Sequence, residues 1–292
     1  SLFFTEKALQ LKKKGIFMLS KSSPNISVIV TSYNRPDALH LVLSALGQQT
    51  QLPSEVIVAD DGSTEETRQL ITQLQTQLSY PLRHIWQVDQ GFQAAKIRNK
   101  AALQTSNPYL IFLDGDCVPF PDFIAQHRQL AEPDYFVSGH RILLNKTLTQ
   151  KVLEEFQPIY KNSSLEWLLH YLHRETNRLF PLLRIDLNKL RKLHPKRWQG
   201  AKSCNLALWK KDFLNINGFD ESFIGWGYED SDLVIRLIRS GTYRKSGKLA
   251  VPVIHLWHPQ NDRAQEPVNL KLLKEIEISA RIRAKMGIDQ LV

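Results

Sequence analysis

The chain has 292 residues, a hydrophobic content of 42% and a formal net charge of +9 at pH 7. A chain of this size can bury a full core, and no segment approaches the roughly 20 uninterrupted apolar residues of a membrane-spanning helix. We therefore expect a soluble, cytoplasmic α/β protein with an anionic partner, such as a nucleotide phosphate, an anionic glycan, a lipid surface or nucleic acid. The two cysteines, Cys117 and Cys204, lack metal-ligand spacing and are expected to be free thiols.

Residues 1–24 show no clear strand and are assigned to an N-terminal extension. From residue 25 onward, short runs rich in β-branched residues alternate with helical patterns. The expected strands cover residues 26–30, 55–59, 82–86 and 110–113, and the expected helices cover residues 36–46, 65–78 and 93–103. This alternation predicts a mostly parallel, Rossmann-like sheet flanked by helices, with the functional side chains at the carboxyl ends of its strands.

Polar side chains follow the first two expected strands and recur in the third expected helix. A tyrosine can stack or pack on a nucleobase, an aspartate can accept a hydrogen bond from it, and a cation can reach a diphosphate. The plainer alternative for each residue alone is an ordinary turn with a helix cap, or a solvated cation. The candidates for binding a nucleotide donor are Thr31, Tyr33, Arg35, Asp60, Asp61, Lys96 and Arg98.

The fourth expected strand ends in Asp114, Gly115 and Asp116. Residues two apart project from the same side of an extended backbone, so the two carboxylates can converge at the end of the strand. Neighbouring carboxylates repel each other unless a cation or a shared proton lies between them, which favours a divalent metal. A polar turn is the alternative interpretation, because Asp-Gly is common in turns.

Four separate stretches carry a resemblance to a known family. No Gly-x-Gly-x-x-Gly follows the first strand and no Walker motif occurs, so a nucleotide would have to be held differently. The stretches at residues 28–35, 58–63, 95–99 and 112–116 resemble the nucleotide-sugar domain of family 2 glycosyltransferases, which have the GT-A fold. The resemblance implies that residues 25–140 bind the donor, with the nucleoside between the first two stretches and a metal on the aspartates bridging the diphosphate.

The middle segment, residues 141–199, is expected to be a helical, basic insertion, because leucines and aromatic residues are interleaved with arginines and lysines. The interpretation that we favour is a helical subdomain whose leucines pack on the sheet and whose charges face water. The alternative is a basic, aromatic-bearing surface that lies against an anionic membrane and meets an acceptor anchored there.

Residues 200–266 are expected to form an acceptor and catalytic half. The stretch from Gly225 and Trp226 to Glu229 and Asp230 resembles a motif shared by β-1,4-galactosyltransferases, polypeptide N-acetylgalactosaminyltransferases and bacterial chondroitin-type polymerases. The resemblance implies that Trp226 and Gly225 contact sugar, that Asp230 is the general base and that Glu229 orients a sugar. Asn205 is included among the expected sugar-contacting residues. An acidic helix start after a glycine-rich turn is the plainer interpretation.

Two histidines, His255 and His258, follow in a short apolar run that is expected to be a strand. Neutral imidazole is a good ligand for Mn²⁺, which accepts mixed oxygen and nitrogen ligands. The related galactosyltransferases carry a metal-binding histidine after the glycine-tryptophan motif. His258 matches it best, and His255 is the second candidate. Residues 267–292 are expected to be an amphipathic C-terminal helix.

Taken together, the sequence predicts an inverting glycosyltransferase that uses Mn²⁺ or Mg²⁺. The metal ligands would be Asp116, Asp114 and one or both histidines, the donor a UDP-sugar, and the acceptor a glycan or glycolipid of lipopolysaccharide or capsule. Peripheral contact with the inner face of the cytoplasmic membrane belongs to the alternative interpretation of the middle segment, and nucleic acid is not an expected partner. A sugar nucleotidyltransferase and a noncatalytic glycan- or nucleic-acid-binding protein are the alternatives.

Overall fold

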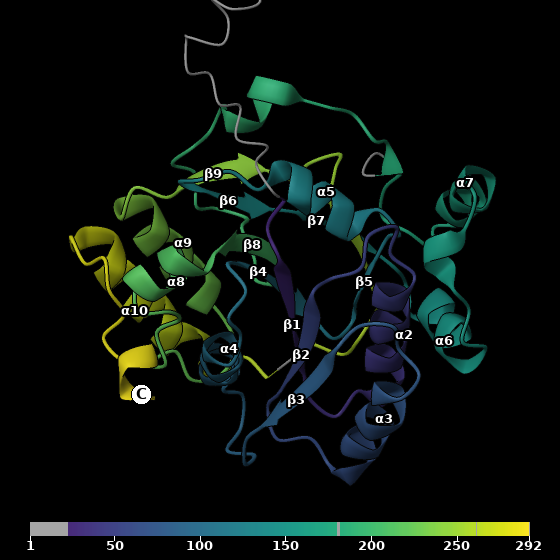
Figure 1. The fold of residues 1–292 in the computed structure, drawn as a ribbon, viewed down its shortest axis with the longest axis horizontal. Coiled ribbons are helices and arrows are strands. Elements are labelled where there is room, and N and C mark those ends of the chain that lie inside the picture. The colour runs from purple at the N-terminus through teal and green to yellow at the C-terminus, as the bar shows by residue number, and fades with distance from the viewer. Residues whose placement is uncertain (1–22, 180–181, 261, 292) are drawn as a thin grey trace, which may run out of the picture.

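The computed structural model describes residues 23–179, 182–260 and 262–291. Almost all of the expected N-terminal extension lies outside these residues. The described chain forms a central sheet with helices on both faces (Figure 1). The predicted α/β class with a mostly parallel sheet is confirmed.

The central sheet has seven strands, and its four sequence-predicted strands are neighbours at one side. Six strands run in one direction and only β8 is antiparallel to its two neighbours. In spatial order the strands are β3 (Leu82–Trp86), β2 (Glu55–Asp60), β1 (Ile26–Ser32), β4 (Tyr109–Asp114), β8 (Asn205–Trp209), β6 (Tyr135–Ser138) and β9 (Tyr243–Ser246). The donor and acceptor halves expected from the sequence therefore share one sheet.

A second, three-stranded sheet lies beyond the end of β4. Its order is β5 (Cys117–Pro119), β10 (Pro252–His255) and β7 (His140–Leu143), with β10 antiparallel to β5 and parallel to β7. The register places His255 opposite Cys117 on one side and Leu143 on the other. This small sheet brings the histidine run to the residues that follow β4.

The helices cover both faces of the central sheet, with α2 and α3 on one side and α4, α8 and α9 on the other (Figure 1). Among the described residues they are α2 (Pro36–Gly47), α3 (Glu65–Gln75), α4 (Ala94–Leu103), α5 (Phe123–Leu130), α6 (Lys146–Glu154), α7 (Ser164–Leu172), α8 (Lys210–Asn215), α9 (Glu229–Arg239) and α10 (Glu266–Ile278). Short 3₁₀ helices are η1 (Ile159–Lys161), η3 (Asn188–Lys192) and η4 (Ile288–Gln290).

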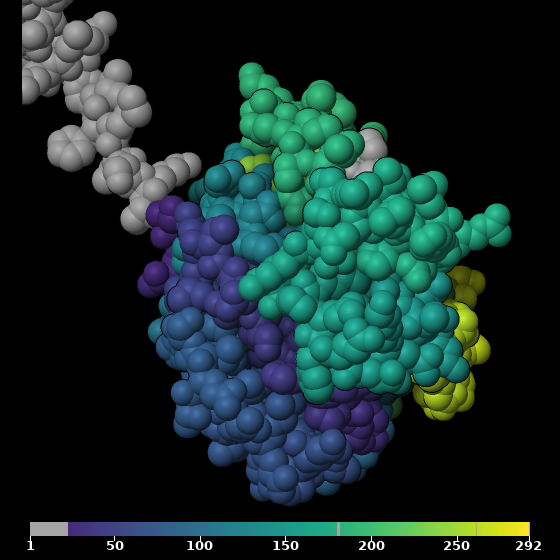
Figure 2. All heavy atoms as spheres, turned by 90° about the vertical axis from the view of Figure 1, so that its right-hand side faces the viewer, coloured from purple at the N-terminus to yellow at the C-terminus, as the bar shows by residue number. Residues whose placement is uncertain are grey.

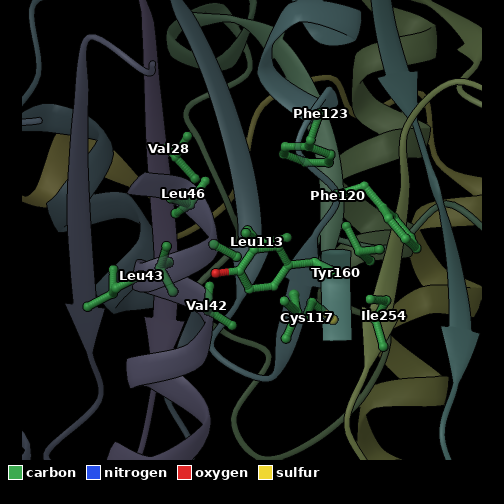
Figure 3. Packing of buried hydrophobic residues seen from close by; sticks show 14 of the residues in the cluster. Val28, Val42, Leu43, Leu46, Leu113, Cys117, Phe120, Phe123, Tyr160 and Ile254 are labelled. Carbon is green, nitrogen blue, oxygen red and sulfur yellow. The ribbon is translucent and has the colours of Figure 1, made fainter. Parts of the chain in front are cut away.

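Two hydrophobic cores result from the alternation of side chains along the strands. In β1, Val28 and Val30 belong to the core beneath α2, whereas Ile29 belongs to the core beneath α4 and α9. Figure 3 shows the first core, where Val28 and Leu113 lie among side chains from α2 and from the segment after β4. Since successive residues of a strand face opposite sides, a strand covered on both faces is apolar throughout.

The expected insertion at residues 141–199 differs from the prediction in two ways. It begins inside strand β7 rather than in a helix. Its leucines fall into two groups: Leu148 and Leu182 pack in or against the core beneath α2, whereas in α7 only Trp167 is buried and Leu165 and Leu172 are 65% and 64% exposed. Our favoured interpretation, that the leucines pack on the sheet, therefore fails for α7, which packs on the body through one edge and projects its apolar face outward. Phe180, one of the aromatic residues of the segment, lies outside the described residues.

The C-terminal helix is shorter than expected. Helix α10 ends at Ile278, and the following residues run across the body of the protein. Two buried carboxylates hold this tail, since the Arg281 guanidinium lies 3.0 Å from Asp220 and 3.3 Å from Asp232. A continued helix would carry Arg281 away from both acids, which explains why the helical pattern is overridden.

Candidate active site

Asp114 and Asp116 follow the central strand but turn to different partners. The Gly115 N–H donates to the Thr31 carbonyl at 2.7 Å, and a Cβ at Gly115 would lie 2.9 Å from that oxygen. Only glycine therefore fits this close approach of two backbones without displacing one of them. The tight turn directs Asp114 toward α4 and Asp116 toward β10.

Asp116 lies in a group with both candidate histidines. Its Oδ2 atom is 3.4 Å from His258 Nε2 and 3.8 Å from His255 Nε2. One ligand atom from each of the three residues lies within 4.8 Å of the other two. Burial lowers the pKa of His255 to about 4, so its imidazole is neutral at pH 7 and has a free electron pair. A carboxylate with two neutral imidazoles fits a divalent cation such as Mn²⁺.

Asp114 belongs instead to a cluster around Arg98, whose side chain is only 4% exposed. The Arg98 guanidinium donates to Thr31 Oγ1 at 2.9 Å, to Asp114 Oδ1 at 3.0 Å and to Glu229 Oε1 at 3.2 Å. Burial lowers the pKa of Arg98, but Asp114, Asp230 and Glu229 outweigh that effect and raise it above its ordinary value. Each guanidinium nitrogen already has an acceptor, so the geometry assigns Arg98 to holding these acids rather than to a diphosphate.

Glu229 and Asp230 begin helix α9, directly after Tyr228 in a left-handed conformation with φ 72°. Burial raises the pKa of Glu229 to about 7, and the negative charge of Asp230 acts in the same direction. The Asp230 Oδ1 atom is buried and has no hydrogen-bond partner in the described structure. The two adjacent carboxyl groups thus differ in their surroundings. Glu229 is held by Arg98, whereas Asp230 has an oxygen that is free to accept a hydrogen bond.

The part of the site expected to bind the nucleoside contains Asp60 and Asp61, whose carboxylates are already hydrogen-bonded within the protein, and the exposed ring of Tyr33. Asp60 accepts from the Ser63 N–H at 2.8 Å and pairs with His84, and Asp61 accepts from the Gln93 N–H at 2.7 Å. Both aspartates are therefore needed to shape the turns after β2 and β3. Tyr33 is 49% exposed, and its hydroxyl donates to Asp89 at 2.9 Å.

The other two donor candidates are cations near the same edge. Lys96 is half-buried on α4, close enough to Glu221 to lower the pKa of that carboxyl against the effect of burial. Arg35 forms an ion pair of 3.2 Å with Asp37. The remaining donor candidate, Thr31, is already engaged, because its hydroxyl accepts from Arg98 at 2.9 Å.

The expected sugar-contacting residues fall into two groups. Trp226 is half-buried with the Arg263 guanidinium 4.5 Å from its ring centre, and Gly225 donates its N–H to the Phe92 carbonyl at 3.0 Å. Both therefore lie at the surface that joins α9 to the donor half. Asn205 is 2% exposed and donates to the Val251 carbonyl at 2.7 Å. The structure assigns Asn205 to linking β8 with the residue before β10 in the interior, away from any surface that a sugar could contact.

One charged residue near these acids was missed in the sequence. Arg141 lies on β7, half-buried, and its charge acts on Asp114 and Asp116. Residue 141 lies at the start of the segment that was expected to be a helical insertion, so it was not considered as a residue of the site. A short strand pattern at residues 140–143 was the available signal.

The chain matches the model of glycosyl transferase family 2 over residues 27–187. A second family model, described as the N-terminal domain of galactosyltransferase, matches residues 187–250. The first match spans more than half of the chain, so the chain belongs to glycosyl transferase family 2 and is a glycosyltransferase. The predicted family, GT-A fold and enzyme class are confirmed, which decides against the two alternative classes.

Among curated proteins the chain is similar to several larger enzymes. It is 30% identical over 230 residues to the validoxylamine A glucosyltransferase of Streptomyces hygroscopicus subsp. limoneus, covering 75% of this chain and 49% of that protein. It is 32% identical over 245 residues to the hyaluronan synthase of Pasteurella multocida, covering 76% of this chain and 23% of that protein. The chain thus spans half or less of the length of these relatives.

Among solved structures, the chain resembles S. aureus TarS 1-349 in complex with UDP. The TM-score is 0.56 at 14% sequence identity, and the alignment covers 91% of this chain and 68% of TarS 1-349. At this identity the likeness shows the shared fold. The described residues include no helix that is long and apolar enough to cross a membrane.

Proposed function

We propose that this glycosyltransferase is inverting and metal-dependent. It would move a sugar from a UDP-sugar to a hydroxyl of a glycan acceptor in the assembly of lipopolysaccharide or capsule. The observation that carries the proposal is the pair of neighbouring clusters, one with a carboxylate and two histidines and one with a buried arginine between two acids. The first would supply the ligands for a cation on a diphosphate, and Asp230, whose charge acts on the second, would be the proton acceptor.

The metal ligands would be Asp116, His255 and His258. When bound, a divalent cation would neutralise the charge that develops on the departing nucleoside diphosphate. The distances of 3.4 and 3.8 Å from Asp116 Oδ2 to the two imidazoles exceed those of good hydrogen bonds. The three side chains therefore converge without satisfying one another, as expected of residues that share a cation.

Asp230 would take the proton of the acceptor hydroxyl as its oxygen attacks the anomeric carbon. The bond from that carbon to the diphosphate breaks on the opposite face of the sugar, and its electrons leave with the diphosphate. The buried, unpartnered Oδ1 atom of Asp230 supports this role. Glu229, held by Arg98 at 3.2 Å, would orient a sugar hydroxyl instead.

The nucleoside would lie over the exposed ring of Tyr33 at the ends of β1 and β2, with the turn after β2 at its edge. The similarity to TarS, whose structure was determined with UDP, supports a uridine nucleotide. The relatives named as hyaluronan and chondroitin synthases support a glycan acceptor. Trp226 is the aromatic surface on which an acceptor sugar would pack.

The acceptor would be anchored in an anionic membrane on which the protein lies. Helices α6 and α7 lie at one side of the molecule (Figure 1), and in Figure 2 the teal segment that contains them covers much of the face turned to the viewer. The exposed apolar side chains of α7 and of the turn after α6 are Phe156, Leu165, Leu168, Leu169, Tyr171 and Leu172. Residues 182–197 add further exposed leucines and contain six cations but only one acidic residue. Apolar side chains interleaved with cations are suited to an anionic interface.

Calorimetric titration of UDP, GDP and CDP, each with and without Mn²⁺, tests the donor and the metal. We expect UDP to bind only with Mn²⁺, and Asp116→Ala to remove that dependence. Asp289→Asn, an exposed carboxylate variant remote from the site, is the matched control. Equal UDP binding with and without Mn²⁺ would contradict the metal site.

Flotation with liposomes tests the membrane contact. We expect the protein to float with vesicles that contain anionic lipid and not with neutral vesicles. A Leu165→Ser, Leu172→Ser double variant should lose flotation while keeping UDP binding. Recovery of the wild type in the soluble fraction with both vesicles would remove this part of the proposal.

A further inference from the structure

Arg141 is a half-buried arginine without a partner. Among the residues that the structure describes, its guanidinium takes part in no hydrogen bond and no ion pair. Other arginines that are largely withdrawn from solvent are bonded to the backbone: Arg191 donates to three carbonyls, and Arg244 donates to two. A guanidinium has five N–H donors, and those of Arg141 are not among the buried atoms that lack a partner, so they reach solvent. These free donors are available to an anion that enters the site.

The second sheet determines where this arginine lies. Strand β7 runs parallel to β10, with Arg141 opposite Val253 and Leu143 opposite His255. Residues opposite each other in a parallel pair share a face, and so do residues two apart in a strand. Arg141 and His255 therefore belong to the same face of this sheet, on which Cys117 is also paired with His255.

The charge of Arg141 reaches the acids of the site. It lowers the pKa of Asp114, although desolvation raises that pKa overall to about 6, and it contributes to the lowered pKa of His255. The neighbouring arginines are already engaged, because Arg98 is held by three acceptors and Arg35 is paired with Asp37. Arg141 is thus the cation beside Asp114 and Asp116 whose hydrogen-bonding capacity is unused.

We propose that Arg141 binds the diphosphate of the nucleotide donor and thereby supplies part of the positive charge that the leaving group requires. This inference rests on the proposed function. A diphosphate entering the site meets the carboxylates of Asp114 and Asp116, which repel it. A planar guanidinium matches two phosphate oxygens at once, so it can offset this repulsion with directional hydrogen bonds.

The experiment compares three ligands that differ only in phosphate, namely UDP, UMP and uridine, by calorimetry in the presence of Mn²⁺. In Arg141→Ala we expect the UDP affinity to fall about tenfold to a hundredfold, as when a charged hydrogen bond is lost, while uridine binding is unchanged. Arg141→Lys keeps the charge and should recover part of the loss. Arg68→Ala, an exposed arginine on α3, should bind all three ligands like the wild type.

The possible results of this experiment separate a role of Arg141 in diphosphate binding from a structural role. Equal UDP affinity in Arg141→Ala and wild type would overturn it, and so would an equal loss for UDP and uridine, which indicates a structural role. If Arg141→Ala does not fold, judged by circular dichroism, the Arg141→Lys and Arg141→Gln variants carry the same comparison. A wild type that binds none of the nucleotides would overturn the proposed function, and this inference with it, whereas UDP binding that ignores Arg141 overturns this inference alone.

Discussion

The two carboxylates of the central motif differ in how completely the protein satisfies them. Asp114 is hydrogen-bonded to Arg98, which also holds Thr31 and Glu229 at distances of 2.9 to 3.2 Å. Asp116 faces two histidines at 3.4 and 3.8 Å, with no good hydrogen bond to either. The cluster around Arg98 is complete, because its members satisfy one another. The cluster of Asp116 with His255 and His258 is incomplete, because its side chains converge without good hydrogen bonds and leave a place for a ligand. The difference separates residues that build the site from residues that act in it.

The largest effect is expected from Asp230→Asn, which changes the acid next to the complete cluster whose Oδ1 atom has no hydrogen-bond partner. The amide keeps the size of the side chain but cannot take a proton, so transfer should fall about a hundredfold to ten-thousandfold. UDP binding should be unchanged. Sugar transfer and UDP titration are measured on the same preparation, with Asp289→Asn as control. Full turnover in the variant would exclude Asp230 as the base.

Arg98→Ala breaks the complete cluster itself. It leaves the Asp114 and Glu229 carboxyl groups without their cation, which should lower the free energy of unfolding by about 3–5 kcal/mol. Urea denaturation followed by circular dichroism measures the change. The exposed variant Arg68→Ala should unfold like the wild type. A loss of UDP affinity without a loss of stability would show instead that Arg98 contacts the donor.

His258→Ala and His255→Ala test which histidines of the incomplete cluster bind the metal. Each imidazole offers one ligand atom near Asp116, so each variant should weaken Mn²⁺ binding by at least about tenfold, since the loss of even an outer partner of a metal ligand costs about tenfold to a hundredfold. Stability should change little at His258, whose side chain is 28% exposed. Mn²⁺ binding followed by electron paramagnetic resonance is the readout. If only one variant loses affinity, that histidine is the ligand and the other has a structural role.

The smallest expected effect is the change in unfolding free energy per pH unit. It comes from buried histidines that the fold keeps neutral. Burial lowers the pKa of His127 to about 3, below the ordinary value of 6.5. The unfolded chain therefore binds a proton that the native state does not, so stability falls as the pH is lowered from 6.5 toward 3. The slope from this residue is about 1.4 kcal/mol per pH unit.

His127→Phe should reduce the slope of unfolding free energy against pH over this range. The ring size is similar, and His127 already packs against Phe123 with ring centres 4.5 Å apart. Urea denaturation at several pH values from 4 to 7 measures the slope. An unchanged slope would mean that His127 is protonated in the native state.

Much of the donor half could be predicted from local sequence. The expected strand over residues 82–86 coincides with β3, and the expected helix over residues 93–103 differs from α4 by one residue. Where local sequence patterns failed to predict the structure, contacts between residues far apart in the chain determined it. The apolar face of α7 has the composition of a packed helix, yet no second layer from the described part of the chain covers it. The tail beyond Ile278 has a helical pattern, yet two buried acids draw Arg281 across the body.

The sequence by itself determined the class of the protein, because hydrophobic periodicity and short motifs depend on residues close together in the chain. It identified Asp114, Asp116, Glu229, Asp230 and the two histidines as residues of interest. Only the tertiary structure decided their partners. Arg98 meets Glu229 across 131 positions of sequence, and Asp116 meets His258 only after β10 has paired with β5. An ion pair between distant residues is created by the packing of their elements, and no local pattern contains that information.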